Sequence, residues 1–195
     1  MTRAVIPLSA FLMLAAASFS YAQKLPDSIR GYKVHEAKVR VRTADGNKRA
    51  GKDTIVTLGS PRIIDIGLDG ITLEIGAEIG GIDQDGQVDS LMFKDVAVHG
   101  VPIQVEDYEH PFKLKKGVSV MLPVPVRGTV STLNIAKVAY KEAIASSDEW
   151  QISGTVFIFG RFRKMGFVFK RVIPVPVNLT IPNPLKALTA AAAKP

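Results

Sequence analysis

Hydrophobic and polar residues alternate along most of this chain, and a period of two residues is typical of β-strands. The alternation is clearest at residues 37–42 and 71–76, where aliphatic residues alternate with charged, polar or small ones. Comparable runs, bounded by Gly, Pro, Asn, Asp or Ser, occur at residues 54–58, 62–66, 88–98, 101–105, 117–129, 150–159 and 166–180. Since only His99 and Gly100 separate two of these runs, we expect those two to form a hairpin.

One segment has a helical period instead. The apolar residues that recur there at a spacing of three or four are Leu133, Ala136, Tyr140 and Ala143. Ser131 and Thr132 precede them and are suited to capping the N-terminus of a helix. The pattern predicts one helix over residues 132–146. Many short strands with a single helix predict a mainly β fold, namely an antiparallel β-sandwich of the immunoglobulin or fibronectin kind.

The core of such a sandwich is expected to form from large apolar residues on the alternating strands. The residues expected to be buried are Leu73, Phe93, Trp150, Ile152 and Val156. Because the chain has no cysteine, its stability depends on this packing and not on disulfides. The same absence excludes thiolate metal sites and cysteine nucleophiles.

Two segments repeat the same arrangement of proline and aliphatic residues, at residues 122–126 and 173–177. Proline lacks the backbone N–H, so two prolines spaced by two residues remove donors along one edge of a strand. We therefore expect both segments to lie in edge strands or at strand ends, where they prevent pairing with other chains.

The first 22 residues have the pattern of a secretory signal peptide. Arg3 precedes an apolar run, and Ser20 and Ala22 place small residues at the recognition positions of a cleavage site. We expect an exported protein, periplasmic or extracellular after cleavage following Ala22; an uncleaved N-terminal anchor is the alternative. No later stretch reaches about 18 consecutive apolar residues, so an integral membrane protein is not expected.

Three segments are predicted to follow the signal peptide at residues 1–22. Residues 23–57 form an N-terminal strand region, residues 58–180 form one β-sandwich domain, and residues 181–195 form an Ala-rich, low-complexity tail. The length of the chain fits a single domain with a sizeable core.

Charge is distributed unevenly along the chain. Residues 23–52 carry nine basic and three acidic side chains, residues 53–110 two basic and twelve acidic, and residues 111–195 thirteen basic and three acidic. Either these segments interleave in the fold and neutralise one another, or they form a dipolar surface whose basic side contacts anionic headgroups or polysaccharide. No nucleic-acid-binding motif accompanies the basic residues, so nucleic acid is not an expected partner.

No constellation of residues in the sequence predicts an enzyme, a cofactor or a metal site. Asp83, Asp85 and Asp89 surround a glycine, yet they lack the spacing of a calcium loop and suit a hairpin turn. Residues 106–110 combine carboxylates with a histidine, but no nucleophile or oxyanion hole is evident beside them. The sequence also lacks the common hydrolase, phosphate-loop and dinucleotide motifs.

The best candidate for a binding site is a basic and aromatic segment at residues 161–171. Its predicted ligand-binding residues are Arg161, Phe162, Arg163 and Lys164. Alternation would place half of this segment in the core; an exposed aromatic and cationic patch would suit a membrane surface or a glycan. The partners that this segment fits are therefore an anionic lipid, a glycan or a protein of the cell envelope.

Residues 58–180 resemble the late embryogenesis abundant type 2 (LEA type 2) family, which carries the water stress and hypersensitive response domain. The segments that carry the resemblance are residues 61–63, 70–75, 88–93, 96–103, 112–117, 122–126, 133–143 and 150–156. The resemblance implies a seven-stranded sandwich with one helix, a role in stress tolerance and no enzymatic activity.

Two functions of different kinds follow from these observations. The resemblance implies an exported, non-catalytic protein that protects against desiccation or osmotic stress. The segment at residues 161–171 predicts instead a cell-envelope binding module for a lipid, a glycan or a partner protein. A contiguous basic and aromatic surface at this segment would favour the binding module.

Overall fold

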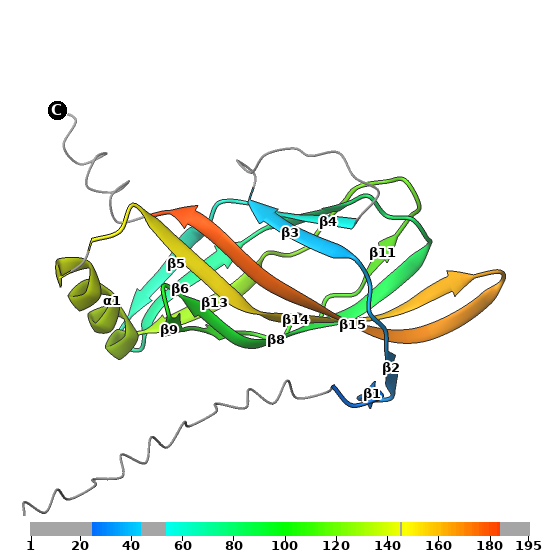
Figure 1. Cartoon of the computed structure of the whole chain (residues 1–195), viewed down its shortest axis with the longest axis horizontal. Helices are drawn as coiled ribbons and strands as arrows, with labels where there is room; N and C mark the ends of the chain where they lie inside the picture. The colour runs from blue at the N-terminus through cyan, green and yellow to red at the C-terminus, as the bar shows by residue number, and fades with distance from the viewer. Residues whose placement is uncertain (1–24, 44–53, 145, 184–195) are drawn as a thin grey trace, which may run out of the picture.

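The computed structural model describes residues 25–43, 54–144 and 146–183 (Figure 1). The predicted signal peptide at residues 1–22 and most of the predicted tail lie outside the described residues. The described part is mainly β with one helix and several sheets packed together, which confirms the predicted β-sandwich class. Strand β15 (Phe167–Pro182) continues past residue 180, where the tail was predicted to begin.

One long sheet forms one layer of the sandwich. Its order is β1 (Ser28–Ile29), β2 (Tyr32–Val34), β15, β14 (Glu149–Lys164), β8 (Gly86–Val98) and β11 (Phe112–Leu114), and β9 (Val101–Pro102) also pairs with β8. His99 and Gly100 connect β8 to β9, both with positive φ, which confirms the predicted hairpin.

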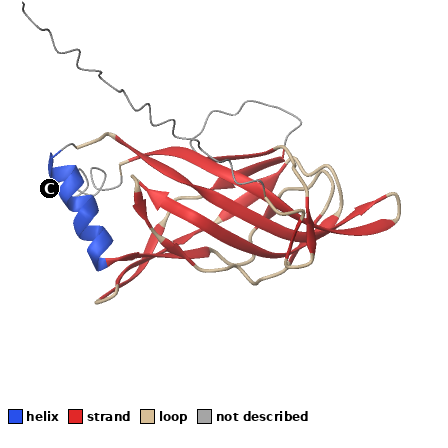
Figure 2. Ribbon diagram, turned by 60° about the horizontal axis from the view of Figure 1, so that its bottom comes forward, coloured by secondary structure: helices blue, strands red, loops and turns tan. Residues whose placement is uncertain are grey.

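Two four-stranded sheets form the other layer. Figure 2 shows the strands of the molecule in red and the helix in blue at one end. One sheet has the order β10 (Gln104–Val105), β13 (Val126–Ser131), β6 (Gly70–Ile75) and β5 (Arg62–Gly67). The other has the order β12 (Val120–Met121), β7 (Ala77–Gly80), β4 (Thr54–Leu58) and β3 (Val39–Thr43). Side chains from all three sheets meet in the interior.

The N-terminal strand region at residues 23–57 belongs to the same body as the domain predicted for residues 58–180. Strand β2 pairs with β15, and β4 pairs with β7. Two pairs, β2 with β15 and β3 with β4, are parallel, so the sandwich is not wholly antiparallel as predicted. Alternation indicates which residues share a face of a strand but carries no information about strand direction.

Both proline segments lie where strand pairing stops. Residues 122–125 separate β12 from β13, at the point where the chain passes from one short sheet to the other. Pro174 and Pro176 lie in β15, which pairs with β2 only at Arg171 and Val172. Beyond Val172, none of the described strands pairs with the edge of β15 that faces away from β14. The prediction of strand ends and edges is confirmed at both places.

Helix α1 (Thr132–Ile144) lies across one end of the molecule and ends two residues before the predicted boundary (Figure 1). The Ser131 hydroxyl accepts a hydrogen bond from the Asn134 N–H (3.4 Å), as expected of an N-cap. The Thr132 hydroxyl donates to the Leu68 carbonyl (2.6 Å), which fixes the helix to the turn after β5.

The core is less complete than the sequence predicts. Trp150 is buried, but Leu73, Phe93, Ile152 and Val156 are only partly buried. Three of these four, Phe93, Ile152 and Val156, line an apolar cavity between the layers. The prediction of burial is therefore wrong for these four residues. For Phe93, Ile152 and Val156 the reason is that the two layers leave space between them.

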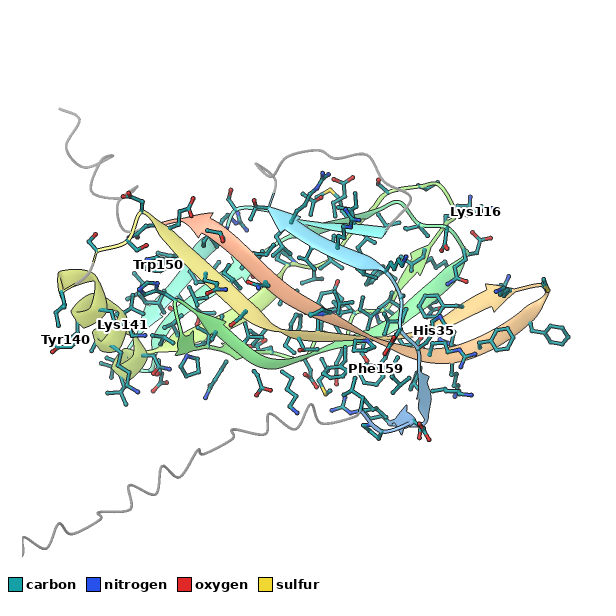
Figure 3. The ribbon with its side chains drawn as sticks, in the orientation of Figure 1. His35, Lys116, Tyr140, Lys141, Trp150 and Phe159 are labelled. Atoms are coloured by element: carbon teal, nitrogen blue, oxygen red, sulfur yellow. The ribbon has the colours of Figure 1, made fainter. Side chains whose placement is uncertain are left out.

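A second, smaller core covers the outer face of the long sheet. Phe159 is 1% exposed and packs with Phe157 and Val172 against the β1–β2 hairpin. The ring of Tyr32 meets that of Phe159 edge-on at 5.3 Å between centroids. Figure 3 shows Phe159 between the long sheet and β1–β2. Successive residues of β14 thus serve two cores, one on each face.

Candidate functional site

Strands β14 and β15 form a long hairpin that contains the predicted binding segment. They pair without interruption from Glu149 opposite Pro182 to Lys164 opposite Phe167. Met165 and Gly166 make the two-residue turn, and both have positive φ (51° and 81°). A turn with two positive φ values matches the right-handed twist of the strands that it connects.

The end of this hairpin projects beyond the rest of the long sheet. The pairing of β14 with β8 ends at Phe162, and the Arg163 N–H still donates to the Asp85 carbonyl (3.0 Å). On the other side, β2 pairs with β15 no further toward the turn than Arg171. Residues 163–170, called here the hairpin tip, therefore form a two-stranded ribbon at the end of the molecule opposite α1 (Figures 1 and 2).

One face of the hairpin carries a row of aromatic rings. Cross-strand partners lie on the same face of a strand pair, and Phe162 is opposite Phe169. Exposure increases along this row, from 6% at Phe162 to 39% at Phe169 and 70% at Phe167. The guanidinium of Arg171 lies over the ring of Phe169, with the Cζ atom 5.4 Å from the ring centroid.

The opposite face carries cations. Arg161 is opposite Lys170, and Arg163 is opposite Val168. Residues 161–171 include five basic and no acidic residues, so the whole segment is cationic. The ribbon thus carries exposed phenylalanines on one face, together with Lys164, which is opposite Phe167, and Arg171, and mainly basic residues on the other face.

Arg161 is fixed at the base of the hairpin by Asp89. Its Nη2 donates to Asp89 Oδ1 (2.7 Å) and its Nε lies 3.1 and 3.2 Å from the two carboxylate oxygens. The Tyr32 hydroxyl donates to Oδ2 of the same carboxylate (3.0 Å). Burial raises the pKa of Tyr32 above its ordinary value of 10.0, and the hydrogen bond to Asp89 adds to this shift. The hydrogen bond to Asp89 also raises the pKa of Arg161.

The turn at the hairpin tip is costly for stability. Met165 occupies the left-handed region, where a non-glycine residue other than Asn or Asp is uncommon. Its side chain is 89% exposed, so it gains no packing in return. Strain combined with an exposed apolar side chain points to a surface selected for contact rather than for stability.

The four predicted binding residues have different environments. Arg163 and Lys164 are exposed and make no ion pair with a carboxylate among the described residues. Arg161 is partly exposed but already paired with Asp89. Phe162 is buried and packs with Ile173 and Val175, so its assignment to a surface patch is corrected: its ring belongs to the core.

Sequence reasoning missed the most exposed apolar residues of the hairpin tip. These are Met165, Phe167 and Val168. The alternation of the segment was visible, but exposure depends on where the neighbouring strands β8 and β2 end. The only sequence signal for the tip was the Met165-Gly166 pair between two regular strands.

The acidic segments are engaged with other parts of the protein. Asp85 accepts a hydrogen bond from the Lys116 N–H (2.8 Å), and Asp89 binds Arg161. Asp107 lies 3.5 Å from Arg30. In the part of the chain that the structure describes, no group of three or more His, Asp or Glu side chains is arranged to hold a metal ion.

No protein-family model matches the chain, and no curated protein matches it. A solved structure described as "Crystal structure of protein from Archaeoglobus fulgidus" is similar, with a TM-score of 0.37 and 12% identity, over 65% of this chain and 96% of that chain. So low a TM-score carries no argument about function.

No helix within the described ranges combines the length and apolar composition required to span a membrane.

Proposed function

We propose that this protein is an exported, non-catalytic module that binds anionic membrane surfaces through the hairpin tip. The observation that carries the proposal is the exposure of Met165 and Phe167 at the end of a projecting, cationic ribbon. Apolar groups at the extremity enter the boundary between headgroups and acyl chains, while the cations behind them contact anionic headgroups.

The energies of the two contributions are of similar size. Fully burying a Phe or Met side chain contributes roughly 1.5–3 kcal/mol. A basic residue near an anionic surface contributes about 1 kcal/mol. Arg163, Lys164 and Lys170 together with the apolar side chains of the tip therefore give a useful but reversible affinity.

A lipid surface fits the hairpin tip better than a glycan. Sugar recognition needs polar groups placed at defined positions around the aromatic rings. Residues 163–170 contain no Asp, Glu, Asn, Gln, Ser or Thr, so the tip has no side-chain acceptor for sugar hydroxyls. The hairpin tip combines apolar side chains at its end with cations next to them. Such a tip needs only a surface with anionic headgroups outside and apolar acyl chains beneath, which is what an anionic bilayer offers.

Vesicle flotation tests the proposal. The purified protein is mixed with phosphatidylcholine vesicles that contain or lack phosphatidylglycerol, and we expect binding only to the anionic vesicles. The double variant Arg163→Glu, Lys164→Glu removes at least about 2 kcal/mol of attraction, or about thirtyfold in Kd. Phe167→Ser should weaken binding about tenfold because it removes the apolar contact.

Matched controls separate the hairpin tip from general charge and hydrophobicity. The double variant Lys94→Glu, Lys137→Glu reverses the same number of exposed charges on β8 and α1. Leu68→Ser removes an apolar side chain that is 99% exposed elsewhere. Both should bind vesicles as the parent does. Equal loss in the tip variants and the controls, or binding to an envelope polysaccharide in place of vesicles, would contradict the proposal.

The protective role implied by the resemblance to LEA type 2 proteins is retained as a second proposal. The hairpin tip offers it a physical route, because a protein bound to headgroups can keep dehydrating bilayers apart. Anionic vesicles loaded with a fluorescent dye should retain more dye through drying with the parent protein than with Phe167→Ser. A labile reporter enzyme dried with the protein, compared with an equal mass of an unrelated globular protein, tests protection that needs no membrane.

A further inference from the structure

The interior of the sandwich contains two adjoining cavities. The first, called here the outer cavity, has a volume of about 360 Å³. Exposed His35, Lys38 and Asp83 line its mouth, and buried Ile79, Val88 and Phe162 line its depth. Figure 3 places His35 where the chain passes from β2 to β3, beside the base of the hairpin. The outer cavity therefore has a polar opening and an apolar floor.

The second, called here the inner cavity, has a volume of about 170 Å³ and lies between the long sheet and both short sheets. Aliphatic residues and Phe93 line it, apart from Gly154 and Ser153. A cavity of this size and lining holds no favourable site for water, and a comparable engineered cavity of about 150 Å³ binds benzene.

The two cavities adjoin. Val56, Ile79 and Ile158 line both of them, so these three side chains lie at the boundary between the apolar floor of the outer cavity and the inner cavity. Protein interiors rarely leave voids larger than a water molecule, and small-molecule sites usually have about 300–1,000 Å³. Two adjoining cavities with an apolar interior and a polar opening suit a single alkyl chain that passes between the side chains at their boundary.

The aromatic row of the hairpin ends in the outer cavity. Phe162 lines the outer cavity, and its cross-strand partner is Phe169, the next ring toward the tip. Phe167 follows on the same face because alternate residues of a strand share a face. A row of aromatic rings therefore runs along one face of the hairpin from the tip to the outer cavity, with Lys164 and Arg171 on the same face.

We propose that the two cavities form a binding site for a single-chain lipid. The alkyl chain occupies the inner cavity and the floor of the outer cavity, and an anionic headgroup, a carboxylate or a phosphate, lies at the mouth beside Lys38. Lys38 makes no ion pair with a carboxylate among the described residues, so its ammonium group is available to that headgroup. Asp83, across the mouth, suits the ammonium of a zwitterionic headgroup. The site goes beyond the surface contact proposed above, since binding to a vesicle needs no cavity.

Fluorescence titration of the purified protein with cis-parinaric acid, below the concentration at which it forms micelles, tests the proposal. We expect saturable enhancement at one site per chain. Val56→Phe fills the junction of the two cavities and should weaken binding at least about tenfold. Val118→Phe adds the same atoms at an exposed position that lines neither cavity and should leave binding unchanged. If Val56→Phe fails to fold, Ala77→Leu, which fills the inner cavity with fewer atoms, replaces it.

Competition identifies the headgroup. Displacement of the probe by a fatty acid but not by lysophosphatidylethanolamine would assign the carboxylate, and the reverse would assign the phosphate. Lys38→Glu should weaken the effective competitor about tenfold, with Lys113→Glu as the control. No enhancement with the parent, or equal affinity in the parent and the folded cavity-filling variant, would overturn the proposal. Phe167→Ser should weaken vesicle binding about tenfold yet keep this binding in solution, which separates the failure of one proposal from that of the other.

Discussion

At the scale of single residues, Asp89 shows how a local pattern can suggest the wrong chemistry. In the sequence it belongs to an acidic cluster that could offer oxygen ligands to calcium. In the fold its carboxylate receives Arg161 from β14 and the Tyr32 hydroxyl from β2. Asp89, in β8, therefore connects three strands at the base of the hairpin. Spacing along the chain could not reveal this, because both partners are more than fifty residues away.

The titration of Tyr32 tests this connection. Burial and the hydrogen bond to Asp89 both raise the pKa of Tyr32, so we expect it to ionise above 10.0. Asp89→Ala should lower that pKa, yet leave it above the ordinary value because burial remains the larger cause. The ¹³Cζ shift in an NMR pH titration, assigned with Tyr32→Phe, measures both values. Ionisation of Tyr32 at or below its ordinary pKa would show that the network is absent.

The same shift sets the sign of a pH effect on stability. The folded-state pKa of Tyr32 lies above the unfolded value, so its contribution to stability is fully present below about pH 10. That contribution is lost as the pH rises through the folded-state pKa. Denaturant melts across this range should fall more steeply for the parent than for Tyr32→Phe.

The exposed turn residue Met165 is predicted to trade stability for binding. Asn tolerates the left-handed region and is preferred before Gly in turns of this kind. Met165→Asn should therefore raise the free energy of unfolding by about 1 kcal/mol. It should also weaken vesicle binding, because the tip loses an apolar side chain. Flotation and denaturant melts on the same sample check both effects, with Leu68→Asn as the control for lost exposed hydrophobicity; a gain in stability without any loss of binding would contradict the role given to Met165.

At the scale of elements, the sequence predicts strands and turns well but not their partners. Alternation located most strands, though not the short strands β1, β2, β7 and β11, and it located the β8–β9 hairpin. The cap at Ser131 located α1. It could not show that residues 122–125 divide one predicted strand between two sheets, or that β3 and β4 are parallel. Pairing depends on contacts between distant segments, which a local pattern does not contain.

The candidate site follows the same rule. Its charge and aromatic content were readable from residues 161–171, since they depend on composition alone. The exposure of individual rings could not be predicted from the sequence, because it depends on the place where β8 stops pairing with β14, at Phe162. The cavities were also beyond prediction: a strand that alternates correctly gives the same pattern whether the facing layer is packed tightly or leaves space.

The two faces of the long sheet should differ in their sensitivity to truncation. Phe159→Ala removes a ring that is 1% exposed and should cost about 3–5 kcal/mol. Phe93→Ala removes a partly buried ring that lines the inner cavity, so it should cost less than about 3 kcal/mol. Denaturant melts of the two variants measure the difference. Equal losses would mean that the inner cavity is filled by packing rather than open to a ligand.

At the scale of the whole molecule, oppositely charged segments of the chain lie against one another. Arg161 pairs with Asp89, Arg127 with Glu74, and Arg30 with Asp107. Each pair joins a basic segment to the acidic segment at residues 53–110, so these segments interleave in part, as one of the two predicted alternatives has it. Arg163 and Lys164 of the hairpin tip take no part in this pairing, because the tip extends past the acidic strands. Positive charge and apolar exposure therefore coincide at one end of an elongated molecule (Figure 1).

This polarity predicts how the protein is oriented on a membrane. The hairpin tip and α1 lie at opposite ends, and Figure 3 labels Tyr140 at the α1 end. Because the chain contains no cysteine, a single introduced cysteine can carry an environment-sensitive fluorophore at a defined place. Phe167→Cys and Tyr140→Cys are well matched, since the parent side chains are 70% and 68% exposed.

With anionic vesicles, the label at position 167 should shift to the blue and become accessible to quenchers buried in the bilayer. The label at position 140 should keep its emission in water and remain accessible to iodide. The reason is geometric: the cations that hold the protein to headgroups lie within a few residues of the turn, whereas α1 is attached at the far end of the sandwich. A blue shift confined to position 140 would place the membrane contact on α1 and overturn the assignment of the hairpin tip. Equal shifts at both positions would mean that the molecule lies flat, with the tip as one contact among several.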